Sequence, residues 1–262
     1  MLTVVLIPVY NERKSVLVVV EGALAHADRV VVVDDGSTDG SAQLVAGFAR
    51  RHQGVTFIGQ SRNVGYSGAL LTGFIYLIEE MERGRLETDD VVVMTDADGQ
   101  LLPEQIPDAR EKMLSEGLDL LLGRRDLSGY PLSKRVGNWG LSSVARILTG
   151  FPYRDVECGF RVMRLHVLAD ILPYYAGLRY SCSQEIGVLT ARRHFHIAND
   201  FATHVARYRP GARARDGFTN LYMAFAAAAR VSLGRRFDPR PLSARPVAEI
   251  VEGHLEASQL KT

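Results

Sequence analysis

Two aspartates separated by one residue follow the apolar run VVVMT, in the segment Asp96-Ala97-Asp98-Gly99-Gln100. The run is typical of a buried strand, and carboxylates at i and i+2 of an extended strand end can point the same way. Such carboxylates repel each other unless a cation lies between them, and oxygen ligands suit Mg²⁺ or Mn²⁺. The bound metal would keep open positions for a diphosphate and stabilise a charged leaving group. Taken alone, the segment could also be an ordinary Asp-Gly surface turn.

Two earlier apolar runs end in polar clusters of a similar kind. Pro8-Val9-Tyr10-Asn11-Glu12 follows the first run, and Asp34-Asp35-Gly36-Ser37 follows the second. Ligands of open parallel sheets bind outside the carboxyl ends of the strands, so we expect the three clusters to border one crevice of nucleotide size. Helix capping by Asn11 and Ser37 is the simpler interpretation of the first two clusters.

Short apolar runs alternate with helical patterns over the first 122 residues. Strands are predicted at Thr3–Ile7, Arg29–Val33, Val55–Ile58, Val91–Thr95 and Leu118–Leu122. Helices are predicted at Lys14–Ala27, Asp39–Arg51, Tyr66–Glu82 and Pro103–Glu116. This alternation is typical of βαβ units, so we predict an α/β fold with a mostly parallel sheet covered by helices on both faces.

The alternation stops near residue 126, and the rest of the chain is less regular. Asn220–Leu233 is apolar nearly all round but, at 14 residues, is too short to cross a bilayer, so it is predicted to be buried or to lie in a membrane surface. Asp238–Pro246 carries three prolines and is typical of a linker. Val247–Leu260 has apolar residues at helical spacing. We therefore expect one large domain over residues 1–235, followed by a linker and a C-terminal amphipathic helix over residues 236–262.

The composition is that of a soluble globular protein, with 262 residues of which 47% are hydrophobic and 23% charged. A net charge of +1 gives no general attraction to nucleic acid. Residues 207–245 nevertheless carry nine arginines against two aspartates, which indicates either a face that meets an anion or a solvated arginine-rich surface. Two cysteines, no recognisable signal peptide and no run of 18 apolar residues predict a cytoplasmic protein with free thiols and without a membrane span.

Five segments, in chain order, resemble glycosyltransferase family 2: IPVYNE, VDDGSTDGS, RNVGYSGAL, DADGQLLPE and ECGFR. Within that family they are most similar to the polyprenyl-phosphate sugar transferases of the dolichyl-phosphate mannose synthase type, over about residues 1–235. The resemblance implies a GT-A fold for this catalytic domain. It also implies transfer of a hexose from a GDP- or UDP-sugar to a polyprenyl phosphate, dolichyl or undecaprenyl, with Mg²⁺ or Mn²⁺. A family member that acts on a soluble small molecule or a polysaccharide is the alternative.

The resemblance also implies roles for the residues at matching positions. The donor would be bound by Pro8, Tyr10, Glu12, Asp35, Arg62 and Asp96. The metal would be held by Asp96, Asp98 and Gln100. The catalytic set would be Asp98, Asp155 and an arginine that is either Arg124 or Arg125, because LLLGRRD departs from the family's Gly-Ser-Arg. Asp155 or Glu157 would approach the donor sugar and the acceptor. The acceptor phosphate would be bound by Arg161, Arg207, Arg209, Arg213 and Arg215.

A phosphate acceptor would explain why the sequence shows no recognisable activated nucleophile, such as a Ser-His-Asp triad. A phosphate monoester has a second pKa of about 6, so it is largely dianionic at neutral pH and can attack a sugar carbon without a strong general base. The enzyme then needs positioning, charge neutralisation and a metal, and a single displacement inverts the anomeric carbon. Peripheral contact with the cytoplasmic membrane face would follow from such an acceptor.

Three other classes of protein are disfavoured. A dinucleotide-binding oxidoreductase needs Gly-x-Gly-x-x-Gly after the first strand, where this chain has Pro-Val-Tyr-Asn-Glu. The Gly-x4-Gly-Lys-Ser/Thr pattern of nucleoside triphosphatases is absent. A non-catalytic binding protein would be free to lose the acidic pair, which Asp96 and Asp98 retain.

Overall fold

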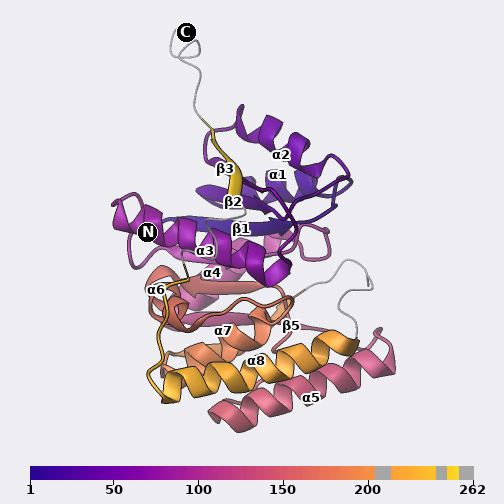
Figure 1. Cartoon of the computed structure of the whole chain (residues 1–262), viewed down its shortest axis with the longest axis vertical. Coiled ribbons are helices and arrows are strands. Elements are labelled where there is room, and N and C mark those ends of the chain that lie inside the picture. Colours follow the sequence, from indigo (N-terminus) through magenta and orange to yellow (C-terminus); the bar gives the residue numbers. More distant parts are fainter. Residues whose placement is uncertain (204–213, 240–246, 254–262) are drawn as a thin grey trace.

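The computed structural model of the chain describes residues 1–203, 214–239 and 247–253 (Figure 1). These residues form one eight-stranded sheet with the strand order β7-β5-β6-β4-β1-β2-β3-β8. The strands are β1 (Thr3–Val9), β2 (Arg29–Asp34), β3 (Val55–Gln60), β4 (Val91–Met94), β5 (Leu120–Arg125), β6 (Arg161–Arg164), β7 (Ile197–Thr203) and β8 (Val247–Glu252). All run in one direction except β6 and β8, so the predicted α/β fold with a mostly parallel sheet is confirmed.

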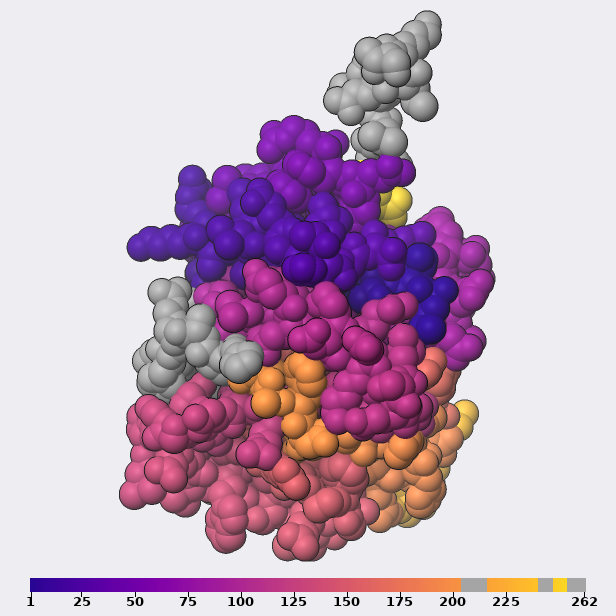
Figure 2. Space-filling model, turned by 180° about the vertical axis from the view of Figure 1, so that it is seen from behind, coloured from indigo at the N-terminus to yellow at the C-terminus, as the bar shows by residue number. Residues whose placement is uncertain are grey.

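Helices cover both faces of the sheet. One face carries α1 (Val16–His26), α2 (Ser41–Ala49), the short 3₁₀ helix η1 (Pro103–Gln105) and α4 (Ile106–Ser115). The other carries α3 (Tyr66–Glu82), α6 (Leu165–Ile171), the 3₁₀ helix η2 (Leu172–Tyr174) and α7 (Cys182–Arg192). Two long helices, α5 (Leu132–Thr149) and α8 (Ala214–Ser232), pack against α7 and against each other at one end of the molecule (Figure 1). Seen from behind, the indigo N-terminal segments lie at the opposite end of the molecule from the pink α5 region (Figure 2).

The buried strands explain why the sheet has two cores. Every residue of β1 is buried, and its side chains alternate between the two faces. Val4 and Leu6 join the core beneath α3, whereas Val5 and Ile7 join the core beneath α1 and α2. A strand buried on both sides needs apolar residues at successive positions, which accounts for the uninterrupted apolar runs in the sequence.

The prediction of a helix over Val247–Leu260 is wrong for residues 247–253, the part of this segment that the structure describes. Val247–Glu252 forms β8, which pairs antiparallel with β3 and brings Val251 opposite Phe57. Without β8 the backbone groups along this side of β3 would form an unpaired sheet edge. The β-branched residues of β8, two valines and an isoleucine, also suit a strand. Pairing with β3 therefore overrides the helical spacing. Residues 254–262 lie outside the described part, as do residues 240–246 of the expected linker.

The apolar segment Asn220–Leu233 belongs to α8, which begins earlier, at Ala214, and ends at Ser232. It is neither wholly buried nor wholly exposed. Ala224 and Ala227 are buried in the core and Met223 is also buried, whereas Tyr222 and Phe225 are exposed. Among the described residues, no helix combines the length and the apolar character needed to cross a membrane.

Candidate active site

A cleft of about 1450 Å³ opens at the carboxyl ends of the parallel strands. Residues after β1, β2, β4 and β5 line one side of it, and residues of α5 and α8 line the other. The predicted nucleotide-sized crevice is thus present. Eight of the predicted site residues line it: Pro8, Tyr10, Glu12, Asp35, Asp96, Asp98, Gln100 and Arg125.

The acidic pair lies at the base of this cleft, directly after β4. Burial raises the pKa of the Asp96 carboxyl, and the nearby Asp98 carboxylate raises it further, whereas a hydrogen bond from Tyr66 lowers it. The Tyr66 hydroxyl donates that bond to Asp96 Oδ1 over 2.6 Å. Gly159 faces the other side of the carboxylate, since a Cβ there would lie 2.4 Å from Asp96 Oδ2. Asp96 is therefore held between a hydroxyl donor and a glycine.

The pair suits a hard divalent cation. The Asp98 carboxylate raises the pKa of Asp96, so a positive charge between the two groups would be stabilising, and Mg²⁺ and Mn²⁺ prefer such oxygen ligands. Within the described ranges there is no group of three or more His, Cys, Asp or Glu side chains placed to hold a metal. A cation here would therefore complete its coordination with ligand oxygens and water. Gln100 donates to both oxygens of Asp98, from its backbone nitrogen (2.9 Å) and from its side-chain amide, so in this arrangement it orients Asp98.

The turn after β2 shapes the nucleotide end of the cleft. Asp35 accepts hydrogen bonds from the backbone nitrogens of Val64 (2.7 Å) and Gly65 (2.9 Å), which ties this turn to the start of α3. Gly36 has φ of +71°, and a Cβ there would lie 2.7 Å from the carbonyl carbon of Arg62. Burial raises the pKa of Asp35 to about 6. The Arg62 side chain itself is exposed, and Arg62 is not among the residues that line the cleft.

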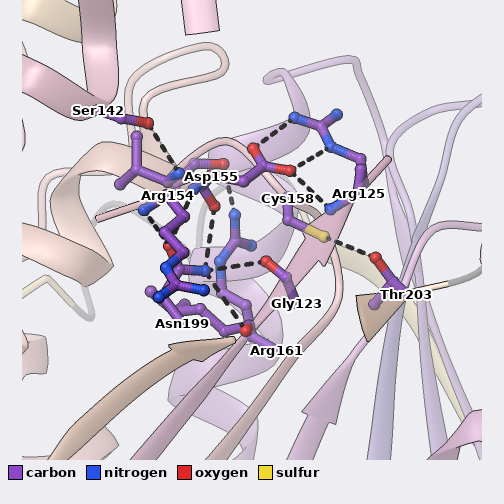
Figure 3. Close-up of polar contacts among 12 residues, drawn as sticks. Gly123, Arg125, Ser142, Arg154, Asp155, Cys158, Arg161, Asn199 and Thr203 are labelled. Atoms are coloured by element: carbon purple, nitrogen blue, oxygen red, sulfur yellow. Dashed lines mark hydrogen bonds and ion pairs between the residues drawn. The ribbon is translucent and has the colours of Figure 1, made fainter. Parts of the chain in front are cut away.

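The structure distinguishes the two arginines at the end of β5. Arg125 lines the cleft and pairs with Asp155 through Nε and Nη2, each over 2.8 Å (Figure 3). Arg124 is exposed and does not line the cleft. Asp155 is 1% exposed and is absent from the cleft wall, so it reaches the cleft through Arg125. The Asn199 side-chain oxygen accepts from the backbone nitrogen of Asp155 (2.9 Å) and so fixes the loop that carries it.

Of the five predicted acceptor-phosphate arginines, only Arg161 has a side chain in the described part of the structure. Arg161 is fully buried, donates to Ser183 and does not line the cleft, so its expected contact with a bound acceptor is not supported by its position. The cause is its place in β6, a strand enclosed between β4 and β5. Arg207, Arg209 and Arg213 lie outside the described residues. Arg215 lies in the first turn of α8, and its side chain is outside the described part of the structure.

Both cysteines are free and fully buried. Burial raises the pKa of Cys158 and of Cys182 to about 11, which disfavours the reactive thiolate. Cys158 contacts Thr203 beside the Arg125–Asp155 pair (Figure 3). The prediction of free thiols is confirmed, and the cysteine in the ECGFR segment has a packing role.

Several cleft residues were missed by sequence reasoning. Tyr66, Asn138, Arg179 and Asn220 all line the cleft, as does Glu157, which was named only as one of two options for the donor sugar. β6 runs antiparallel to its neighbours, so the segment before it, with Glu157 and Gly159, ends at the same sheet edge as the acidic pair. The direction of a strand is not visible in its composition. Only the family motif ECGFR gave a signal for this segment.

Comparison with known proteins agrees with this geometry. A model of the family described as "Glycosyl transferase family 2" matches residues 4–172. The chain belongs to glycosyl transferase family 2. The enzyme is 32% identical over 174 residues to the undecaprenyl-phosphate mannosyltransferase of Micrococcus luteus, covering 63% of this chain and 68% of that one. It is 27% identical to the UDP-N-acetylglucosamine–dolichyl-phosphate N-acetylglucosaminyltransferase of Methanococcus voltae, covering 73% and 81%.

Solved structures show the same fold. Glucosyl-3-phosphoglycerate synthase from Mycobacterium tuberculosis, in complex with UDP, superimposes with a TM-score of 0.63 over 88% of this chain and 80% of that chain, at 17% identity. Another structure of that synthase holds Mn²⁺, UDP-glucose and phosphoglyceric acid, with a TM-score of 0.60 and 17% identity over 87% and 80% of the two chains. The GT-A fold of the glycosyltransferase is thereby established.

Proposed function

We propose that the enzyme transfers a hexose from a GDP- or UDP-sugar to a polyprenyl phosphate, with inversion at the anomeric carbon and with Mg²⁺ or Mn²⁺. One observation carries the proposal: a single cleft is lined at one end by the acidic pair Asp96 and Asp98 and at the other by residues of α5 and α8, among them the exposed apolar side chains of Val136 and Phe218. The polar end suits a nucleoside diphosphate. The apolar end suits a substrate with a hydrocarbon chain.

Different cleft residues would bind the nucleoside and the diphosphate of the donor. Tyr10 and Asp35 would contact the base and ribose, since both line the cleft beyond the acidic pair. Asp96 and Asp98 would hold the cation, which when bound neutralises the diphosphate leaving group. Arg125, fixed by Asp155, would add a second positive charge beside the reacting phosphates. A guanidinium held in advance loses little entropy when it meets an anion.

The reaction itself needs no protein nucleophile. An oxygen of the acceptor phosphate attacks the anomeric carbon while the bond from that carbon to the nucleoside diphosphate breaks. The acceptor is largely dianionic at neutral pH, so no protein group has to remove a proton from it. Alignment of the two substrates is then the main contribution of the protein.

The outer side of the cleft favours a lipid-borne acceptor. We define the α5/α8 surface as the large apolar side chains exposed on these two adjacent helices, namely Leu132, Val136, Trp139, Ile147, Phe218, Tyr222 and Phe225. Each is at least 55% exposed, and two of them, Val136 and Phe218, also line the cleft. Exposed arginines lie on α5, at positions 135 and 146, and directly after α8, at positions 235 and 236, where Arg236 also donates to the Tyr174 hydroxyl. Aromatic and aliphatic groups flanked by arginines suit an interface with anionic lipid headgroups.

The relatives support the acceptor class. The enzymes of Micrococcus luteus and Methanococcus voltae act, by their names, on undecaprenyl phosphate and dolichyl phosphate. Their sugars differ, being mannose in one and N-acetylglucosamine in the other. The proposal therefore commits to the acceptor class and leaves the sugar to experiment.

Thermal unfolding with GDP- and UDP-sugars, each with and without Mn²⁺, tests the donor half of the proposal. A ligand at one hundred times its Kd raises the free energy of unfolding by about 2.7 kcal/mol, so a metal-dependent rise in Tm identifies the donor. Asp98→Ala should abolish that rise without lowering the Tm of the unliganded enzyme. A metal-dependent shift that persists in Asp98→Ala would overturn the metal assignment.

Transfer of labelled sugar tests the acceptor half. With the identified donor, we expect label on undecaprenyl phosphate in detergent or vesicles and none on water-soluble phosphate monoesters. Label on a soluble phosphate alone would instead support the family members that act on small-molecule acceptors.

A further inference from the structure

Tyr66 lines the cleft and has no role in the mechanism above. It is the first residue of α3, and its hydroxyl donates a hydrogen bond to Asp96 Oδ1 over 2.6 Å. Among the described residues, this hydroxyl is the one hydrogen-bond donor to the Asp96 side chain. An ionised carboxylate can only accept hydrogen bonds, and a partly buried one needs a donor in place of water. Tyr66 therefore binds one of the two carboxylates that would hold the cation.

Hydrogen bonds on both sides fix the backbone that carries Tyr66. The backbone nitrogens of the two preceding residues donate to Asp35 over 2.7 and 2.9 Å. Ser67, the following residue, donates from its backbone nitrogen to the carbonyl oxygen of Arg179 over 2.7 Å. Gly65 has φ of +90°, a left-handed value that suits glycine, and so turns the chain into α3. The start of α3 is thus joined to the turn after β2 and to the segment before α7.

Ser67 also joins the start of α3 to the core on this face of the sheet. It is fully buried, and its hydroxyl accepts a hydrogen bond from the backbone nitrogen of Cys182 over 2.9 Å. Its carbonyl oxygen accepts another from the Tyr175 hydroxyl over 3.1 Å. The Tyr66 ring packs against the same core and is stacked with the Tyr180 ring, with 6.2 Å between the two centroids. The Tyr66 hydroxyl is therefore held in place before any ligand binds.

The two carboxylates of the acidic pair have different partners. Asp98 accepts hydrogen bonds from Gln100, two residues further along the same turn. Asp96 accepts its hydrogen bond from Tyr66, 30 positions away, and its other oxygen faces Gly159. Loss of the Tyr66 hydroxyl would leave only packing to set the direction of the Asp96 carboxylate. A divalent cation needs its oxygen ligands in defined directions, and Mg²⁺ is the more demanding of the two candidates for geometry.

We propose that Tyr66 is a positioning residue of the cation site, which holds the Asp96 carboxylate in the orientation that binds Mg²⁺ or Mn²⁺. The inference rests on the proposed function and deepens it. Hydrogen-bonding partners of metal ligands typically contribute about 10- to 100-fold to metal affinity. The hydroxyl acts through Asp96, so its loss should weaken binding of the cation and leave metal-free binding of the nucleotide unchanged.

Tyr66→Phe tests this role, because it removes the hydroxyl and keeps the ring that packs against the core. Mn²⁺ is titrated in the presence of UDP or GDP, whichever the thermal screen identifies, and the electron paramagnetic resonance signal of free Mn²⁺ gives its Kd. We expect that Kd to rise at least about tenfold in Tyr66→Phe. Calorimetric titration of the same nucleoside diphosphate without Mn²⁺ should give the affinity of the unaltered enzyme. A distorted cleft would instead weaken binding both with and without the metal.

Tyr76→Phe is the matched control. Tyr76 also lies on α3, packs partly buried against the same core and donates its hydroxyl hydrogen to a carboxylate, that of Glu252, over 3.1 Å. Tyr76 does not line the cleft, so this variant should bind Mn²⁺ as the unaltered enzyme does.

Two results would overturn the inference. One is an unchanged Mn²⁺ affinity in Tyr66→Phe, and the other is an equal loss of nucleotide binding with and without Mn²⁺ in a variant that circular dichroism shows to be folded. Either result leaves the donor class standing, as long as the unaltered enzyme binds UDP or GDP with Mn²⁺. Failure of the unaltered enzyme to bind both UDP and GDP with Mn²⁺ overturns the proposed function and this inference together.

Discussion

Asp155 binds Arg125 through both carboxylate oxygens, at 2.8 Å each, and accepts a third hydrogen bond from the Arg125 backbone nitrogen at 3.1 Å. The pair joins the end of β5 to the loop before β6 (Figure 3). Side chains alternate along a strand, so of two successive arginines only one can face the cleft. This pairing makes Arg125, rather than Arg124, the arginine that the reaction can use.

Asp155→Ala should lower the free energy of unfolding by about 3–5 kcal/mol, since removal of one partner from a buried ion pair leaves the other uncompensated. Urea denaturation followed by circular dichroism measures the loss. Arg124→Ala is the control and should change stability by no more than about 0.5 kcal/mol, because Arg124 is exposed. Similar losses in the two variants would mean that the Arg125–Asp155 pair does not stabilise the fold.

The parts of the fold that the sequence predicts are those set by local patterns. The helix over Tyr66–Glu82 has the bounds that were predicted, and each of the first five strands lies within a few residues of its predicted run. The acidic pair was found because a strand end and two carboxylates are adjacent in the chain. Such features need only the periodicity and the chemistry of neighbouring residues.

The parts that the sequence does not predict depend on pairing between distant segments. Glu157 and Asn220 are hydrogen-bonded across 63 positions, and no periodicity connects them. Arg161 was expected at the acceptor, yet the enclosure of β6 buries it. Val247–Glu252 has helical spacing but pairs with β3, because the edge of the sheet provides partners for its backbone.

Gly159→Ala should weaken metal-dependent donor binding by at least about tenfold, because a Cβ would lie 2.4 Å from Asp96 Oδ2 and must displace that carboxylate. Calorimetric titration of the donor with and without Mn²⁺ measures the loss. Gly47→Ala provides the comparison, since Gly47 lies in α2 with no atom within 4 Å of its would-be Cβ. That variant should bind donor normally and gain up to about 1 kcal/mol of stability. Unaltered metal-dependent binding in Gly159→Ala would show that the glycine does not set the position of Asp96.

Donor binding should depend on pH through Asp35, whose pKa is raised to about 6 by burial. Above this pH the ionised carboxylate can accept hydrogen bonds from a nucleoside, and below it the protonated form loses that capacity. The affinity for a sugar nucleotide should therefore be constant above about pH 7 and fall by up to about tenfold per pH unit below 6. Fluorescence titration of uridine or guanosine, which lack the diphosphate that the cation would hold, follows this step without the metal site. Asp35→Asn should bind weakly at every pH, and a step that survives in this variant would assign it to another group.

The α5/α8 surface should bind anionic membranes. The double variant Trp139→Ser/Phe225→Ser removes two aromatic side chains that are 71% and 55% exposed and do not line the cleft. Each large side chain buried in an apolar phase contributes about 1.5–3 kcal/mol, so sedimentation with phosphatidylglycerol vesicles should weaken by more than about tenfold. Metal-dependent donor binding should stay intact, while transfer to undecaprenyl phosphate in vesicles should fall with the membrane affinity.

Val18→Ser is the control for general loss of apolar surface, because Val18 is also 71% exposed but lies on α1, a helix of the opposite layer. It should sediment with vesicles as the unaltered enzyme does. Equal losses in Val18→Ser and in the double variant would indicate nonspecific adsorption. Undiminished vesicle binding in the double variant would remove the α5/α8 surface from the proposal and shift the search for a lipid contact to the exposed arginines on α5 and directly after α8.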